Sequence, residues 1–389
     1  MPATEARGRW ALPLSMFIGT LAWSFVYVSL PFYIERISTV DAAATLRWTG
    51  WILGISSLVT VLIAPFSAHI FGERNPKGSY IATQMLQGGG FFLMAAARTL
   101  PELFFSRMLL GFMGAVSTFA FIMVGRSGGD VRRGISAIQS GMTMGQVLGP
   151  AAGALVAARV GFRVSFVVAG FMLWACSALV AWGVPSQRAP VSGHDRTHTA
   201  SLREVATVCL LVLGGSTQVF FLTAILPKIL PPLGVPETMT LEVGGLLIFA
   251  TGLAAALGAI AAPRIGELIG DRTTIVWFLV ASSLGLAALA LAPGVWSFGI
   301  LRFVQVLCIA PVFPLSVAAI AQRASGTAIG VVNSSRIAAA FVGPVLATTL
   351  LAWVSPAVVY LTLAGLGLLV VPLVAGLGAG SRARKEGVA

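Results

Sequence analysis

The chain has 389 residues, of which 57% are hydrophobic and only 10% are charged, and its formal net charge is +12. A soluble domain carries about 25% charged residues, so this surface has too few charges to face water. Lipid is the solvent that suits such a surface, and the composition therefore predicts an integral membrane protein. The basic residues are scattered over short segments rather than gathered in one stripe, which argues against a nucleic-acid-binding protein.

Twelve apolar segments are long enough to cross a bilayer, which takes about 20 residues of helix. The predicted spans are residues 10–34, 48–71, 79–97, 101–124, 135–159, 163–184, 205–230, 241–265, 273–292, 295–320, 327–351 and 355–379. We therefore predict an all-α integral membrane protein with two six-helix bundles, residues 1–184 and 205–389. Residues 185–204 are polar and rich in Pro, Ser and Thr, which predicts a flexible cytoplasmic linker.

The basic residues lie mostly on one side of the predicted membrane. With both termini in the cytoplasm, sixteen of the 25 Lys and Arg residues are cytoplasmic, six are outside and three lie within spans. The positive-inside rule favours this orientation. We expect a multi-pass protein of the cell inner (plasma) membrane, with both termini cytoplasmic, that works as a monomer.

Two stretches with nearly the same sequence lie about half the chain apart. Residues 64–74 read APFSAHIFGER, and residues 262–272 read APRIGELIGDR. Further pairs recur at a similar offset, namely Leu30-Pro31 with Leu226-Pro227, Arg107 with Arg302, and Gly149-Pro150 with Gly343-Pro344. The two bundles are therefore predicted to be pseudo-symmetric repeats, as in transporters that rock one half against the other around a site at the midplane.

These features resemble the major facilitator superfamily, and within it the twelve-helix exporter and antiporter branch. The loop motif of the superfamily is similar to residues 65–74 and 263–272, and its fourth-helix motif to Arg107 and Gly111. Its fifth-helix exporter motif, GxxxGPxxGG, is matched by Gly145, Gly149, Pro150 and Gly153. The resemblance implies the major facilitator fold, alternating access, and export of drugs or metabolites in exchange for protons.

The resemblance also implies gating roles for the fifth-helix motif and for both loop motifs. The kink at Gly149-Pro150 is expected to seal the path from the cytoplasm to the outside, although tight packing alone would also explain it. An acid in the loop motif is expected to latch one conformation, and the second half keeps it as Glu267. The first half has His69 there, either a pH-sensitive latch or a surface histidine without that role. The other gating residues expected in the loops are Gly72, Arg74, Gly270, Asp271 and Arg272.

Three arginines lie within predicted spans, where a charge costs a few kcal/mol and needs a partner. They are Arg107, Arg302 and Arg336. Each is either a substrate or coupling residue, or an arginine satisfied by backbone carbonyls or by an acid on an adjacent helix. All thirteen Asp and Glu residues, in contrast, fall in loops or at span ends. The interior is thus positive, which predicts an anionic or neutral-amphipathic substrate. The candidate proton carriers are Glu35, Glu102 and, if the eighth span starts earlier, Glu242.

Aromatic and amide side chains within the spans suit a broad, mostly apolar cavity. The first candidates for lining it are Tyr27, Gln139 and Asn333, of which the last two are related by the repeat. A lipid-facing position is the alternative for each of them.

The sequence therefore predicts a secondary active transporter that exports a small amphipathic or anionic molecule and is coupled to protons. The alternatives are an uncoupled facilitator, an importer or a lipid flippase of the same fold, and a non-transporting membrane sensor. An enzyme is not expected, because no nucleophile–base set, metal-ligand cluster or phosphate-binding loop is visible. We expect no cofactor or metal; the expected partners are a small-molecule substrate, a proton and the lipid bilayer.

Overall fold

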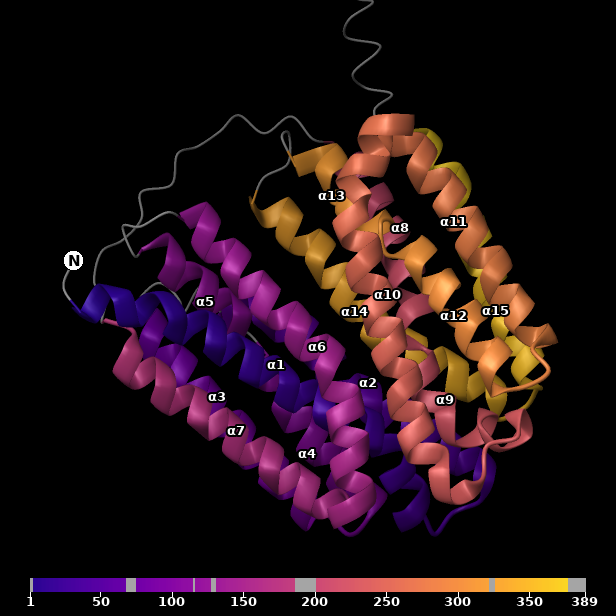
Figure 1. The fold of residues 1–389 in the computed structure, drawn as a ribbon, viewed down its shortest axis with the longest axis horizontal. Coiled ribbons are helices and arrows are strands. Elements are labelled where there is room, and N and C mark those ends of the chain that lie inside the picture. The colour runs from indigo at the N-terminus through magenta and orange to yellow at the C-terminus, as the bar shows by residue number, and fades with distance from the viewer. Residues whose placement is uncertain are drawn as a thin grey trace, which may run out of the picture. The chain divides into compact units, whose positions relative to one another are not determined.

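The computed structural model describes residues 3–67, 75–114, 116–126, 131–185, 201–321 and 326–376. These residues form helices and their connections and contain no strand (Figure 1). Each predicted span is occupied by one helix or by two consecutive ones. The prediction of an all-α membrane protein is confirmed.

The helices of the two halves follow the predicted order. In the first half they are α1 (Ala3–Ile37), α2 (Ala42–Ser67), α3 (Pro76–Ala96), α4 (Leu100–Phe112), α5 (Val116–Gly125), α6 (Val131–Val160) and α7 (Phe162–Gly183). In the second half they are α8 (Leu202–Phe220), α9 (Leu222–Ile229), α10 (Thr240–Ile269), α11 (Asp271–Ala288), α12 (Val295–Ile309), α13 (Val312–Ala321), α14 (Gly326–Leu351) and α15 (Pro356–Leu369). Short 3₁₀ segments are η2 (Pro231–Leu233), η3 (Glu237–Met239), η4 (Leu289–Leu291) and η5 (Val371–Gly376). The fourth, seventh and tenth spans are thus each divided into two helices.

Ten segments of the described chain are long and apolar enough to cross a membrane. The two remaining predicted spans are helices as well, α3 with 21 residues and α6 with 30. Both carry polar side chains that lower their hydropathy: Gln84 and Gln87 on α3, and Gln139 and Gln146 on α6. The glutamines of α3 are buried and those of α6 are exposed.

Helix α8 begins with a capping box. The Ser201 hydroxyl accepts a hydrogen bond from the backbone N–H of Glu204 at 3.2 Å, and the Glu204 carboxylate accepts one from the N–H of Ser201 at 3.0 Å. This reciprocal pair satisfies two backbone donors that a helix start leaves open. The seventh span therefore starts at Leu202, three residues before the predicted position.

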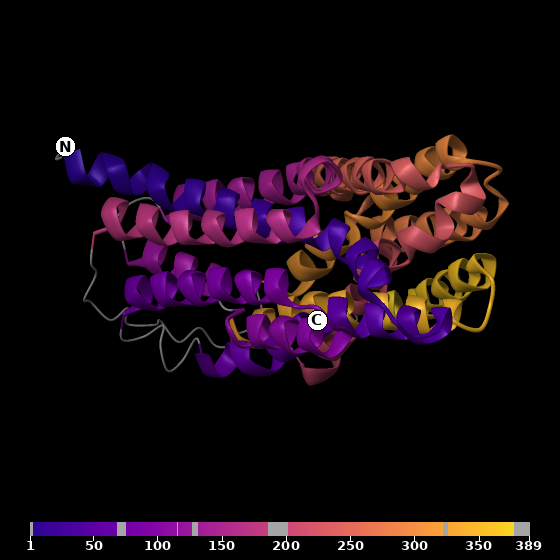
Figure 2. The same ribbon diagram turned by 90° about the horizontal axis from the view of Figure 1, so that it is seen from below.

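The chain divides into two compact units. The first holds Met1–Gly193 with Pro236–Phe249, and the second holds His194–Val235 with Ala250–Ala389. In the first unit, α1 packs along α6 and α7, α3 packs on α7, and α2 packs on α4 (Figure 2).

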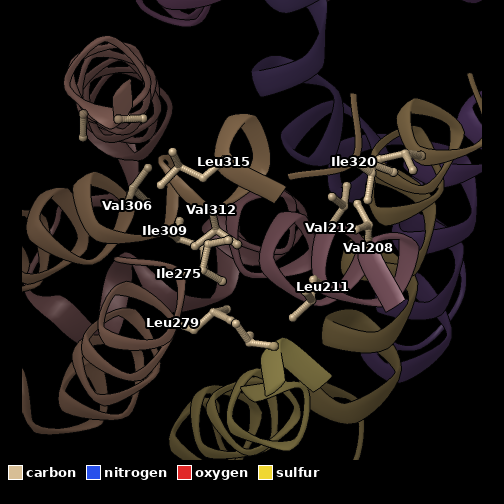
Figure 3. Packing of buried hydrophobic residues seen from close by; sticks show 14 residues of the cluster. Val208, Leu211, Val212, Ile275, Leu279, Val306, Ile309, Val312, Leu315 and Ile320 are labelled. Carbon is tan, nitrogen blue, oxygen red and sulfur yellow. The ribbon is translucent and has the colours of Figure 1, made fainter. Parts of the chain in front are cut away.

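The second unit has a continuous apolar core between α8, α11, α12 and α13 (Figure 3). Ile275 of α11, Ile309 of α12 and Val312 of α13 point toward one another in this core. Leu211 of α8 and Leu279 of α11 extend it. In a bilayer such a core stabilises the fold by close van der Waals packing rather than by removal from water.

Candidate functional site

Arg107 on α4 is almost fully buried, with 2% of its surface exposed, and it is held by α2. Its Nε donates to the carbonyl oxygen of Ile52 at 3.2 Å, and its Nη2 donates to that of Leu53 at 3.1 Å. The guanidinium carbon lies 5.3 Å from the ring centroid of Trp23 on α1, a cation–π distance. One side chain thus joins α1, α2 and α4 within the first unit.

Two successive hydrogen bonds connect α1, α3 and the break in the fourth span. The indole N–H of Trp23 donates to Oε1 of Gln87 on α3 at 3.2 Å. Gln87 Nε2 then donates to the carbonyl oxygen of Met113 at 2.6 Å. Met113 is the residue that caps α4. The break between α4 and α5 is therefore supported by a side chain of another helix.

Tyr27, one helical turn after Trp23 on α1, has a buried hydroxyl with no hydrogen-bond partner among the described residues. A buried polar group without a partner costs about 1–3 kcal/mol. Such a group is either a local defect or one whose partner is a ligand or a water molecule.

We expect Tyr27→Phe to leave the stability of the purified protein unchanged or to raise it by up to about 1 kcal/mol, because no protein hydrogen bond is lost. Tyr33→Phe is the matched control, since the Tyr33 hydroxyl donates to the carbonyl oxygen of Ala97 at 2.8 Å and accepts from Arg163 Nε at 3.2 Å. That variant should be less stable by about 1 kcal/mol. Thermal unfolding in detergent measures both; a lower midpoint for Tyr27→Phe would show that its hydroxyl has a protein partner.

Arg302 on α12 is 1% exposed and is tied to α8. Its Nη1 donates to the carbonyl oxygen of Gln218 at 2.8 Å and to Oε1 of Gln305. Its Nη2 donates to the carbonyl oxygen of Val219 at 2.9 Å. Gln305 Nε2 donates to Gln218 Oε1 at 3.0 Å, and Gln218 Nε2 donates to the hydroxyl of Ser283 on α11 at 3.1 Å. The network therefore joins α8, α11 and α12.

The two buried arginines correspond in the repeat but hold different helices. Each guanidinium lies over an aromatic ring, that of Trp23 for Arg107 and that of Phe221, at 5.0 Å, for Arg302. The carbonyls that Arg107 binds belong to the second span, whereas those that Arg302 binds belong to the seventh, the counterpart of the first. Within the described chain neither arginine pairs with a carboxylate. Of the partners expected from the sequence, backbone carbonyls are the ones observed.

Arg336 on α14 is only half-buried. Its guanidinium carbon lies 5.2 Å from the ring centroid of Phe313 on α13. Among the described residues it has no hydrogen-bond or ion-pair partner. Of the three intramembrane arginines, Arg336 is therefore the one whose N–H groups have no acceptor among the described residues.

The polar residues expected to line a cavity do not meet at one place in the first unit. A Cβ on Gly141 would lie 2.6 Å from the Pro13 carbonyl oxygen, which puts Gln139 near the start of α1. Tyr27 lies fourteen residues further along α1, about 21 Å at 1.5 Å per residue. Gln139 and Asn333 are exposed at corresponding places on α6 and α14, and Glu35 is exposed near the end of α1.

The glycines of the fifth-helix motif lie against the backbone of α1. A Cβ on Gly145 would lie 2.6 Å from the Phe17 carbonyl oxygen, and one on Gly149 would lie 2.5 Å from the Ser24 Cβ. A Cβ on Gly153 would overlap the carbonyl group of Phe25. Pro150 lies within α6, which continues past it. The stripe starts one turn earlier than predicted, at Gly141, a position that the four-residue spacing of the glycines could have indicated.

The loop motifs are described only in the second half; His69, Gly72 and Arg74 lie outside the described residues. Gly270 has φ +86° between α10 and α11, a left-handed conformation that favours glycine. Glu267, Asp271 and Arg272 are exposed around it. Glu267 has no hydrogen-bond or ion-pair partner among the described residues, so its role as a latch stays a prediction.

The helical spans and the arginines buried among them define a multi-pass α-helical membrane protein. The family model of the Major Facilitator Superfamily matches residues 12–236 and 207–388. The chain therefore belongs to the Major Facilitator Superfamily and has its fold. It is a transporter and not an enzyme, and the relatives described next are transporters as well.

Two bacterial relatives cover most of the chain. An MFS-type transporter of Bacillus subtilis, YuxJ, is 26% identical over 345 residues, which are 86% of this chain and 88% of the relative. The multidrug resistance protein MdtG of Serratia proteamaculans is 24% identical over 305 residues, 75% of this chain and 73% of the relative. Together with the family match, they support the efflux branch of the superfamily that the sequence predicted.

Solved structures share the fold at low identity. The human organic anion transporter MFSD10 aligns with a TM-score of 0.70 at 18% identity and covers 96% of this chain and 100% of its own. An auto-inhibited peptide transporter of the POT family aligns with a TM-score of 0.75 at 11% identity and covers 96% of both chains.

Proposed function

We propose that this protein is a secondary exporter that moves a small amphipathic or anionic molecule by alternating access between two pseudo-symmetric bundles, residues 1–184 and 205–389. The main observation behind this proposal is that the charged side chains within its spans are positive. Arg107 and Arg302 are buried on carbonyl and amide oxygens, and Arg336 has no described anionic partner. A permanent cation would be repelled by these charges, whereas an anion or a neutral amphipath would not.

Two further observations support export. The relative MdtG is named a multidrug resistance protein, and its similarity extends over 75% of this chain. The glycine stripe of α6, which matches the exporter motif, packs closely on α1, with Pro150 in the same helix. In this proposal the close α1–α6 contact keeps the cytoplasmic path sealed while the substrate leaves on the other side.

Proton coupling and orientation complete the proposal. Glu35 and Glu102 lie at the ends of α1 and α4, where a carboxylate exchanges protons with water without the cost of deep burial. The excess of Lys and Arg in the expected cytoplasmic segments supports an orientation with both termini in the cytoplasm, in the cell inner (plasma) membrane. The exporter works as a monomer in this scheme.

Transport by purified protein in liposomes tests the proposal. We expect 2-naphthoate to accumulate against its concentration gradient when a pH gradient is imposed, and to stop accumulating when an ionophore collapses that gradient. Protein-free liposomes are the control for passive leakage. Equilibration that ignores the pH gradient would contradict proton coupling and favour an uncoupled facilitator. Transport of tetraphenylphosphonium alone would contradict the proposed substrate charge.

A further inference from the structure

Arg336 lies well inside the membrane-spanning part of α14. The span runs over Gly330–Leu351, so Arg336 is about 9 Å from its start at 1.5 Å per residue. Phe313 is about 10 Å from the end of the preceding span at Ile320. The guanidinium and the ring on which it stacks are therefore at the same depth, where a charge costs a few kcal/mol unless it is compensated.

The side chain leaves α14 on its packed face. Val332, four residues before Arg336, and Ala339, three residues after it, are both fully buried. Residues with this spacing share one face of a helix. Arg336 therefore points into the protein rather than toward lipid, yet it keeps part of its surface accessible.

The first half shows that the fold does not need a charge at this place. Gly149-Pro150 corresponds to Gly343-Pro344, and in that register Met142 corresponds to Arg336. Met142 packs against an apolar cluster that contains Phe119 of α5. Arg336 lies over Phe313 of α13, the helix that occupies the place of α5 in the second half. A methionine fills this position in one half, so the arginine in the other half serves something besides packing.

The other two intramembrane arginines have structural partners. Arg107 and Arg302 donate to five carbonyl or amide oxygens between them and are nearly inaccessible. Arg336 donates to none among the described residues. Stacking on Phe313 occupies one face of its guanidinium and leaves the N–H groups at the edge of the plane, which is the edge that binds oxyanions in a bidentate fashion.

We infer that Arg336 binds the oxyanion group of the substrate, with Phe313 holding the guanidinium in place and the apolar body of the substrate lying against the surrounding helices. This inference rests on the proposed function, because it assumes an anionic substrate. It adds the residue that binds the negative charge of that substrate. The preferred ligand is an apolar molecule with one carboxylate; a sulfonate or phosphonate on the same body presents related chemistry and distinguishes planar from tetrahedral oxyanions.

Binding to the purified full-length protein in detergent tests this assignment without transport. The probes are 2-naphthoate, its neutral counterpart 2-naphthamide, and 2-naphthalenesulfonate. We expect the wild type to bind 2-naphthoate at least about tenfold more tightly than the amide, the effect of one buried charged partner. Arg336→Met should lose this preference while its unfolding midpoint stays near that of the wild type, because the first half accommodates methionine at the same place. Arg336→Gln is a second neutral variant, and Arg336→Lys should keep part of the preference.

Several results would overturn the assignment. The first is an Arg336→Met variant that keeps the preference for the carboxylate, and the second is a wild type that binds naphthoate no better than the amide. Loss of probe binding in nanodiscs of phosphatidylglycerol but not of phosphatidylcholine would identify a lipid headgroup as the occupant instead. If the preference for the carboxylate depends on Arg336 but no probe is transported, the proposed function fails and the binding site stands. If the probes are transported but the preference does not depend on Arg336, the binding site fails and the proposed function stands.

Discussion

Replacing Gly153 with alanine is expected to destabilise the protein by about 2–3 kcal/mol and to abolish transport. A Cβ at this position would overlap the carbonyl group of Phe25 on α1. Both partners are backbone of long, packed helices, so neither can rotate away as a side chain could, and overpacking of this kind costs about 1–3 kcal/mol or more. The unfolding midpoint in detergent and transport in liposomes measure the two effects.

Gly89→Ala is the matched control for this substitution. Gly89 lies within α3, and a Cβ there would meet no atom within 4 Å. The change should stabilise the helix by up to about 1 kcal/mol, because alanine has the higher helix propensity. Equal behaviour of the two alanine variants would contradict the assigned role of the α1–α6 contact. A well-expressed Gly149→Leu variant with normal export would contradict the proposed gate.

The helices were predictable because the thickness of the bilayer sets the length of a span and its apolar interior sets the hydropathy that a span needs. The same reasoning placed α3 and α6, although their glutamines lower the hydropathy of both. Breaks within spans, such as that between α4 and α5, were not predictable, because their supports come from elsewhere in the chain. Gln87, which binds the carbonyl of Met113, shows this dependence.

The arginines show how much of the candidate site could be predicted from the sequence. Their presence inside spans was visible in the sequence, but nothing in it shows which backbone carbonyls two helices bring within reach. Ile52 and Leu53 became partners of Arg107 only through the packing of α2 on α4. For the same reason, the repeat could not reveal that Arg302 binds α8 rather than the counterpart of α2.

Arg302→Met is expected to have the largest effect on stability, a loss of about 3 kcal/mol or more. The substitution removes the donors for three oxygen acceptors, the carbonyls of Gln218 and Val219 and Oε1 of Gln305. Interhelical hydrogen bonds in membrane proteins average about 0.6 kcal/mol, and charge-assisted ones are roughly twice as strong. Gln218 and Gln305 are buried, so water cannot replace the donor to their oxygens and each of these adds a desolvation cost.

Arg336→Met is the control for this prediction, because it makes the same chemical change in the same unit. Arg336 has no described hydrogen-bond partner to leave unpaired, so the change should move the unfolding midpoint little. We therefore expect Arg302→Met to lower both the yield of folded protein and its unfolding midpoint, and Arg336→Met to lower neither while it loses selectivity for anions. If both variants are destabilised to the same extent, Arg336 stabilises the fold as Arg302 does. If neither is destabilised, the Arg302 network does not hold α8 to α12.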